Sequence, residues 1–260
     1  MIRPQSIAIV GGMGRMGALT ARFFSEAGYS VTAFGRSASG TIPWEEVAEH
    51  DVIVLSIPIS TVEPVMRELG PITRKNGVVI DNSSVKAKPV QSMLQHCRGE
   101  VIGSHPLFGP ATESMKDHIV FVCPARSNRW YSWFRSFLED TGARVVEIDP
   151  EKHDRLMASV QVLRHLLLFC LGRSMMRLDY DMGSDLDVSG PWFSTIVGLL
   201  QRQLAQDPEL YSEIIASNPH SDEVVKAFGE SVEEMCALYK SEDRSDLVRM
   251  IEEIASYGRP

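Results

Sequence analysis

The sequence contains few cysteines and no surplus of positive charge, and both absences exclude classes of protein. Its four cysteines are far apart and form no CxxC pair: Cys97, Cys123, Cys170 and Cys236. This spacing predicts neither a zinc site nor a disulfide framework, and we expect reduced thiols in a cytoplasmic protein. The net charge of −8 leaves no basic surplus to meet the phosphates of nucleic acid or of an acidic membrane. We therefore expect no nucleic-acid partner.

Long hydrophobic runs and a leader pattern are also missing. No uninterrupted apolar run approaches the roughly 18 residues needed to span a bilayer. The first five residues lead directly into a predicted strand and lack the charged-then-apolar pattern of a signal peptide. We expect no membrane partner. The 260 residues are enough for one large domain or two modest ones, each with its own core.

The first half of the chain alternates short β-rich runs with helical stretches. The predicted strands are residues 7–10, 31–34, 52–57, 78–80, 101–102, 119–122 and 145–148. Such continuous apolar strands are typical of a parallel sheet covered on both faces by helices. The fold class is therefore α/β, with a doubly wound parallel sheet of the Rossmann type over residues 1–150.

After Asp149-Pro150 the pattern becomes entirely helical. Residues 151–178 predict one long helix, because Leu156, Val160 and Leu163 recur at helical spacing. A loop is expected at 179–190, and further helices at 191–206, from Asp207-Pro208 onward, at 219–239 and at 243–257. The sequence thus predicts an all-helical C-terminal domain over residues 151–260. Its apolar stretches at 197–200 and 214–216 favour a homodimer.

A glycine-rich segment follows the first strand and opens the first helix. It reads Gly12, Met13, Gly14, Arg15, Met16 and Gly17. Glycines in this GxGxxG pattern permit a tight turn and close approach of the backbone, so that a helix N-terminus can hold a pyrophosphate. The context of strand, loop and helix predicts a dinucleotide site.

The end of the second strand favours NADP over NAD. NAD sites usually carry an acidic residue there to bind the ribose 2′-hydroxyl. Here the strand is followed by Gly35, Arg36 and Ser37. A guanidinium suits a 2′-phosphate because it offers a charged fork of donors. Ser56, near the end of the third strand, and Pro58, which follows that strand, are further candidates for the cofactor site.

Polar side chains also follow later strands or interrupt the long helix. Ser84 lies in the stretch after the fourth strand, and His105 lies in a Ser-His-Pro stretch after the fifth. In a doubly wound fold these strand ends are where ligands bind. Gln161 and His165, together with Leu168, share one helix face at spacings of four and three residues. That face is predicted to line a cleft.

Several of these segments together resemble one enzyme family. They are Ser84-Val85-Lys86, His105-Pro106-Leu107-Phe108-Gly109-Pro110, His153-Asp154, Gln161 with His165, and Arg202 with the segment 205–211. This combination is similar to the prephenate dehydrogenase family, and most of all to the dehydrogenase part of fused chorismate mutase–prephenate dehydrogenases. Because the phosphate loop lies at the start of the sequence, no mutase domain is expected.

The resemblance implies a Rossmann domain, a helical dimerisation domain and an active site that oxidatively decarboxylates a cyclohexadienol. His105 would then draw the proton from the ring hydroxyl, as a neutral imidazole can at neutral pH. Ser84 would bond the hydroxyl or His105. Gln161 and His165 would line the substrate pocket, and Arg202 would hold a substrate carboxylate. His153 and Asp154 are interpreted only as the start of the long helix.

Other functions stay open. Relatives of the fused type carry an arginine shortly after the proline that opens the helix bearing Arg202, but here Pro191 is followed by Trp192-Phe193-Ser194. The substrate is then either prephenate, arogenate or 4-amino-4-deoxyprephenate. A β-hydroxyacid dehydrogenase would need a Lys followed four residues later by Asn on the long helix, and that pair is missing. If the protein were a non-enzymatic NADP-binding regulator, we would expect some of the candidate site residues to be replaced.

Overall fold

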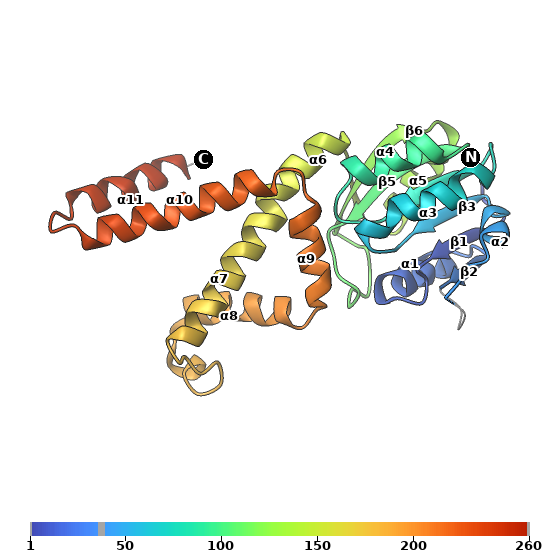
Figure 1. The fold of residues 1–260 in the computed structure, drawn as a ribbon. Helices are drawn as coiled ribbons and strands as arrows, with labels where there is room; N and C mark the ends of the chain where they lie inside the picture. Colours follow the sequence, from blue (N-terminus) through green and yellow to red (C-terminus); the bar gives the residue numbers. More distant parts are fainter. Residues whose placement is uncertain (1, 36–39, 259–260) are drawn as a thin grey trace. The chain divides into compact units, whose positions relative to one another are not determined.

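The computed structural model describes residues 2–35 and 40–258 (Figure 1). Contacts within the chain divide it into two compact units. The first unit combines Met1–Met157 with Gln203–Asn218, and the second combines Ala158–Arg202 with Pro219–Pro260. The expected boundary at residue 150 stays a prediction, and the segment 203–218 is grouped with the first part of the chain.

The first unit is built on a seven-stranded sheet with the order β2-β1-β3-β4-β5-β6-β7. Its strands are β1 Ile7–Val10, β2 Val31–Phe34, β3 Val52–Leu55, β4 Val78–Asp81, β5 Glu100–Pro106, β6 Ile119–Arg126 and β7 Arg144–Glu147. The first five pair in parallel. Their carboxyl ends therefore lie at one edge of the sheet, where a doubly wound fold binds its ligands.

Strand β6 departs from the predicted all-parallel sheet. It pairs antiparallel with β5, so that His105 lies opposite Phe121. The loop of residues 107–118 joins the two strands without a crossover helix, and a parallel connection requires such a crossover. The fifth strand also runs to Pro106, so His105 lies inside the strand and not after it as the sequence predicted.

Both faces of the sheet carry helices, because neighbouring residues of one strand point to opposite sides. Ile7 and Ile9 of β1 join a core under helices α1 and α5. Ala8 and Val10 join a second core with α2, α3 and α4. The helices of this unit are α1 Arg15–Glu26, α2 Trp44–Ala48, α3 Val62–Leu69, α4 Ala87–His96, α5 Arg129–Asp140, α6 Pro150–Met157 and α9 Pro208–Ser217.

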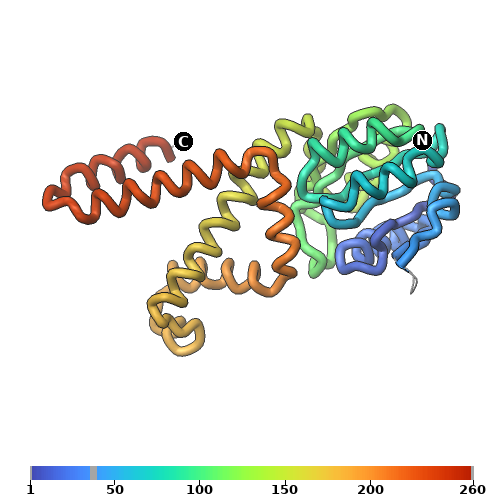
Figure 2. The backbone as a smooth tube through the Cα atoms, viewed as in Figure 1, coloured from blue at the N-terminus to red at the C-terminus, as the bar shows by residue number. Residues whose placement is uncertain are grey.

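The second unit is helical throughout its regular elements, as the tube in Figure 2 makes clear. It begins with a π-helical segment, Ala158–Leu163, and continues in α7 Arg164–Arg177, α8 Gly190–Leu204, α10 Ser221–Lys240 and α11 Ser245–Tyr257. A π-helical turn inside an α-helix is often found at functional sites. It contains Gln161.

Only part of the apolar surface predicted from the sequence is exposed, with Leu199 47% exposed. Val197 and Leu200, from a stretch chosen as a dimer surface, are completely buried, and Ile214 is only 4% exposed. These side chains fill the core of their own chain. Helix α11 also exposes Val248, Ile251 and Ile254, and none of its residues, all of which the structure describes, is buried.

The helix over residues 150–177 contains an 18-residue window with a mean hydropathy of 1.3, which is long and apolar enough to pass a length-and-composition test for a membrane span. The expectation of no such segment rested on uninterrupted apolar runs, whereas this test averages over a window and therefore accepts a stretch that contains polar residues. One helix of this kind is weak evidence for a membrane span, because a helix of a soluble protein passes the same test.

Candidate active site

The glycine-rich loop connects β1 to α1 and depends on glycine at two positions. Gly11 has a φ angle of +82°, in the left-handed region that side chains disfavour. A Cβ on Gly17 would stand 2.1 Å from the carbonyl oxygen of Gly11. The loop can therefore pass close to the first turn of the helix only because these side chains are absent.

The first turn of α1 is suited to a phosphate group. Gly14 is the N-cap and supplies no side-chain cap, and the first turn contains no acidic residue. Backbone amides at such a helix start attract an anion. Met13 is 79% exposed beside the loop, and Arg15 and Met16 open the helix. The residues present therefore fit a dinucleotide.

The other expected cofactor residues lie at the neighbouring strand ends. Ser56 follows β3 and donates its backbone amide to the carbonyl of Val10 at 2.8 Å, which ties it to the end of β1. Pro58 is exposed just beyond it. Gly35 directly follows β2, as expected. Arg36 and Ser37 lie outside the described residues.

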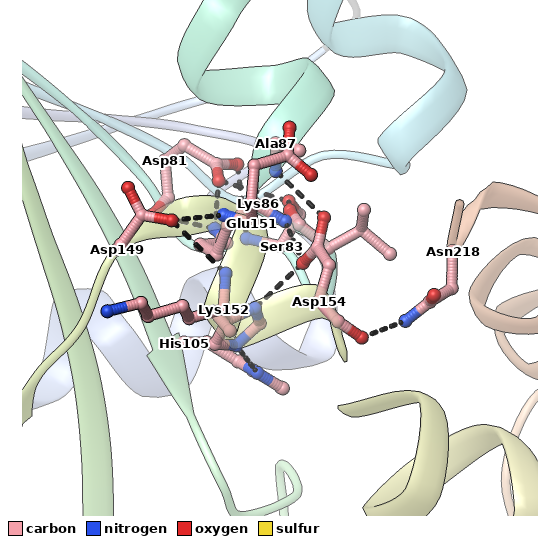
Figure 3. Close-up of polar contacts among 12 residues, drawn as sticks. Asp81, Ser83, Lys86, Ala87, His105, Asp149, Glu151, Lys152, Asp154 and Asn218 are labelled. Carbon is pink, nitrogen blue, oxygen red and sulfur yellow. Dashed lines mark hydrogen bonds and ion pairs between the residues drawn. The ribbon is translucent and has the colours of Figure 1, made fainter. Parts of the chain in front are cut away.

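His105 is buried in β5, with 3% of its surface exposed, and belongs to a chain of hydrogen-bonded side chains. Its Nδ1 lies 2.9 Å from Nε2 of His153, and Nδ1 of His153 lies 2.8 Å from a carboxylate oxygen of Asp154 (Figure 3). Strand β5 thus presents His105 to the first turns of helix α6. The two imidazoles and the carboxylate form one continuous line.

The carboxylate of Asp154 is held by the start of helix α4. It accepts hydrogen bonds from the backbone amides of Lys86 at 2.7 Å and of Ala87 at 2.9 Å. Amides at a helix N-terminus stabilise a negative charge. Asn218 donates its side-chain amide to the backbone carbonyl of Asp154 at 2.8 Å. The start of α4 therefore holds the carboxylate itself, whereas Asn218 bonds the backbone of this residue.

Lys86 lies next to this series of hydrogen-bonded side chains and is completely buried. Its ammonium forms an ion pair with Asp81 at the end of β4 and donates to the carbonyl of Ser104 at 2.7 Å. Ser83 also donates its hydroxyl to Asp81 at 3.0 Å. Because Ser104 directly precedes His105, these contacts connect the end of β4 to the strand that carries the histidine.

Burial sets the protonation of the two histidines. The pKa of His105 is lowered well below its usual value, first by loss of water and then by the charges of His153 and Lys86. The pKa of His153 is also lowered by burial, although its hydrogen bond to Asp154 acts in the opposite direction. Both imidazoles are therefore neutral at pH 7, as a general base requires.

Ser84 lies half-buried in the loop after β4. Its hydroxyl has no hydrogen-bonding partner among the described residues, so the expected bond to His105 is not formed. Such catalytic hydrogen bonds often tighten only when substrate is bound.

The remaining expected residues belong to the second unit. Gln161 lies in the π-helical segment with 9% of its surface exposed, and His165 follows in α7 with 2% exposed. Leu168 shares their burial, which agrees with the predicted common face. Arg202 is exposed in the last turn of α8. Asp207, which follows this helix in the sequence, caps α9 by accepting from the amide of Glu209 at 3.0 Å.

Sequence reasoning missed three members of this site. His153 and Asp154 were interpreted only as a helix start, and Lys86 only as part of a motif. A His-Asp pair opening an otherwise apolar helix was a usable signal, because two buried polar groups need partners. The identity of the partners could not be read from the sequence, since His105 and His153 are 48 residues apart.

Two family models together match most of the chain. The model described as the nucleotide-binding domain of prephenate dehydrogenase matches residues 31–147, and the one described as its dimerization domain matches residues 149–253. Among solved structures, prephenate dehydrogenase from A. aeolicus, in complex with hydroxyphenyl propionate and NAD+, superposes with a TM-score of 0.75. It covers 98% of both chains at 21% identity, which shows the shared fold.

Curated relatives extend the match to the whole chain. A protein named "Probable arogenate/prephenate dehydrogenase" from Methanocaldococcus jannaschii is 29% identical over 97% of this chain and 60% of its own length. The T-protein of Enterobacter agglomerans is 30% identical over 99% of this chain and 66% of its own. The chain thus spans less than two thirds of the length of these relatives. By its sequence and its fold, it belongs to the prephenate/arogenate dehydrogenase family.

Proposed function

We propose that this protein is a nicotinamide-dependent oxidoreductase that oxidatively decarboxylates prephenate or a close analogue. One observation carries the proposal: the buried, neutral His105 lies at the same sheet edge as the glycine-rich loop. A base at that edge and a dinucleotide loop are what a hydride-transferring site requires.

The reaction balances with one proton acceptor and one hydride acceptor. His105 takes the proton from the ring 4-hydroxyl, and the hydroxyl becomes a carbonyl-like oxygen as C4 loses a hydride. When bound, the nicotinamide ring accepts that hydride. The ring carboxylate leaves as CO2, its electron pair completes the aromatic ring, and the oxygen regains a proton as a phenol. Aromatisation drives the step.

Five side chains have proposed roles. His105 and Ser84 act at the hydroxyl, Gln161 and His165 line the substrate pocket, and Arg202 binds a substrate carboxylate. A guanidinium is well matched to a carboxylate because it donates two parallel hydrogen bonds. The burial of Gln161 and His165 supports a pocket role, since buried polar side chains on an apolar helix need partners.

The substrate side chain is the open part of this proposal. Pro191, which opens helix α8, is followed by Trp192, Phe193 and Ser194, so that no arginine precedes Arg202 on this helix. One cation fewer favours a substrate with less negative charge on its side chain. Arogenate, whose side-chain ammonium offsets its carboxylate, is therefore the first alternative to prephenate. The second is 4-amino-4-deoxyprephenate, which has an amine in place of the hydroxyl at ring C4.

NADP is the proposed cofactor. Gly35 stands where an acidic residue would bind the ribose 2′-hydroxyl of NAD, and the sequence continues with Arg36 and Ser37. A glycine neither attracts the hydroxyl nor repels a phosphate. An adjacent guanidinium favours the 2′-phosphate.

We further propose a cytoplasmic homodimer with a domain boundary near residue 150, giving domains 1–150 and 151–260. The exposed row of Val248, Ile251 and Ile254 on α11 supports self-association, because soluble monomers rarely expose such a continuous apolar face. The two family matches meet at residues 147 and 149.

Turnover tests the function directly. The purified protein is assayed with prephenate, arogenate and 4-amino-4-deoxyprephenate, each with NAD and with NADP. We expect reduced cofactor and CO2 with at least one substrate. His105→Ala should lower kcat by about 10²- to 10⁴-fold and leave cofactor affinity unchanged. Cofactor binding without turnover of any substrate would instead favour a regulator, and a loss under fivefold would remove His105 from the mechanism.

A further inference from the structure

His153 and Asp154 continue the hydrogen-bonded line that begins at His105, but they have no role in the reaction proposed for His105. We propose that these two residues position His105 by fixing its tautomer, with the proton on Nδ1 and the acceptor lone pair on Nε2. The inference rests on the proposed role of His105 as the base. It makes Nε2 the atom that receives the substrate proton.

The tautomer follows from the one member of the line that can only accept. An ionised carboxylate has no proton to donate, so Nδ1 of His153 must donate to Asp154 across their 2.8 Å contact. A neutral imidazole with its proton on Nδ1 has an acceptor at Nε2. That Nε2 lies 2.9 Å from Nδ1 of His105, which must therefore be the donor. The only lone pair then left on the His105 ring is at Nε2.

The start of the line is fixed because Asp154 is held as an anion. The amides of Lys86 and Ala87 both donate to its carboxylate at the N-terminus of α4. A protonated carboxyl would face these donors with a hydrogen of its own. Each of the two Asp154 oxygens accepts from one of these amides, so each is already occupied by an N–H donor. The direction of every donor in the line is set by this helix start.

The same line stabilises the charge that catalysis creates. When Nε2 of His105 takes a proton, its Nδ1–H still points to an acceptor, and the negative charge of Asp154 lies one imidazole further on. This is the arrangement by which a buried aspartate supports a histidine base in other enzymes. The charged groups that act on the two rings are Asp154 of α6, Lys86 at the start of α4 and Asp81 of β4. Phe121 of β6 packs edge-to-face against His153, with the two ring centres 5.4 Å apart.

The tautomer can be observed without turnover. In ¹⁵N-detected NMR of the intact protein at pH 7.5, the Nδ1 of His105 should carry the proton and its Nε2 should not. His153→Leu removes the acceptor and should shift His105 toward the other tautomer. Assignment of the proton to Nε2 of His105 in the unmodified protein would overturn the proposal.

Two substitutions of His153 distinguish a role in positioning His105 from a role in filling space. His153→Gln supplies a carbonyl that can accept from His105, whereas His153→Leu fills the space without an acceptor. We expect His153→Leu to lower kcat by about 10²- to 10³-fold with KM changed by less than threefold, and His153→Gln to recover most of the loss. Equal losses in both variants would show that His153 only packs against its neighbours.

Asn218→Ala is the matched control for a purely structural effect. It removes a buried hydrogen bond to the backbone of Asp154 but leaves the line of donors intact. We expect a lower melting temperature with kcat and the His105 tautomer unchanged. A kcat loss as large as that of His153→Leu would contradict the positioning role. If the unmodified protein turns over none of the substrates, the proposed function fails, while the NMR result still decides the tautomer.

Discussion

The ammonium of Lys86 joins two strands by bonding the carbonyl oxygen of Ser104 at 2.7 Å while paired with Asp81. Both charged side chains are completely buried. A buried ion pair adds little net stability by itself, but removing one partner leaves an uncompensated charge in the interior. The pair should therefore affect stability most when one partner is removed.

Lys86→Met should lower the free energy of unfolding by about 3–5 kcal/mol, because Asp81 would remain buried and unpaired. The double variant Asp81→Asn with Lys86→Met should recover much of this loss, since no charge remains. Urea unfolding of the three proteins measures both differences. A double variant no more stable than Lys86→Met would show that the loss comes from the missing contact with Ser104 and not from the unpaired charge.

A second prediction concerns the close approach in the glycine loop. A Cβ at position 17 would meet the backbone oxygen of Gly11 at 2.1 Å, and backbone cannot move aside as a flexible side chain can. Gly17→Ala should therefore cost about 1–3 kcal/mol and weaken dinucleotide binding at least tenfold. In contrast, nothing lies within 4 Å of a Cβ at Gly229 in α10. Gly229→Ala should stabilise the helix by about 0.5–1 kcal/mol and serves as the control.

The first strands could be predicted from the sequence because their signal is local. Strands β1 and β2 have the predicted bounds, because each is an apolar run that a glycine ends. The antiparallel β6 could not be predicted, because strand direction depends on a partner elsewhere in the chain. The hydrogen-bonded line from His105 to Asp154 could not be predicted for the same reason. The sequence shows each of these residues, but whether they touch depends on how β5 packs against α6.

The two buried histidines predict how stability depends on pH. Burial lowers the pKa of both His105 and His153, whereas in the unfolded chain each returns to about 6.5. Below that pH the unfolded chain binds protons that the folded chain does not, so stability is full above pH 6.5 and falls as pH decreases. Each histidine should contribute a slope of about 1 kcal/mol per pH unit.

Urea unfolding at pH 7.5, 6.5 and 5.5 measures this slope. His153→Leu should make it shallower, because one titrating group is removed. A slope that is the same in both proteins would mean that His153 does not titrate on unfolding.

The last prediction concerns the proposed preference for NADP. One or two charge-assisted hydrogen bonds from Arg36 and Ser37 to a 2′-phosphate are worth roughly 1.5–3 kcal/mol each, and solvent exposure reduces this gain. We therefore expect kcat/KM with NADP to exceed that with NAD by at least about tenfold. Gly35→Glu combined with Arg36→Gln should reverse the preference, because a carboxylate binds the ribose hydroxyl and repels the phosphate.

Gly35→Ala separates charge from bulk in this experiment. A Cβ at position 35 would stand 2.7 Å from Cγ of Met13, a flexible side chain that can move aside. The alanine variant should therefore lower activity with both cofactors alike and leave their ratio unchanged. Because the ratio reports only the contacts that distinguish the two cofactors, a preference of the unmodified protein for NAD would mean that Arg36 does not bind the 2′-phosphate.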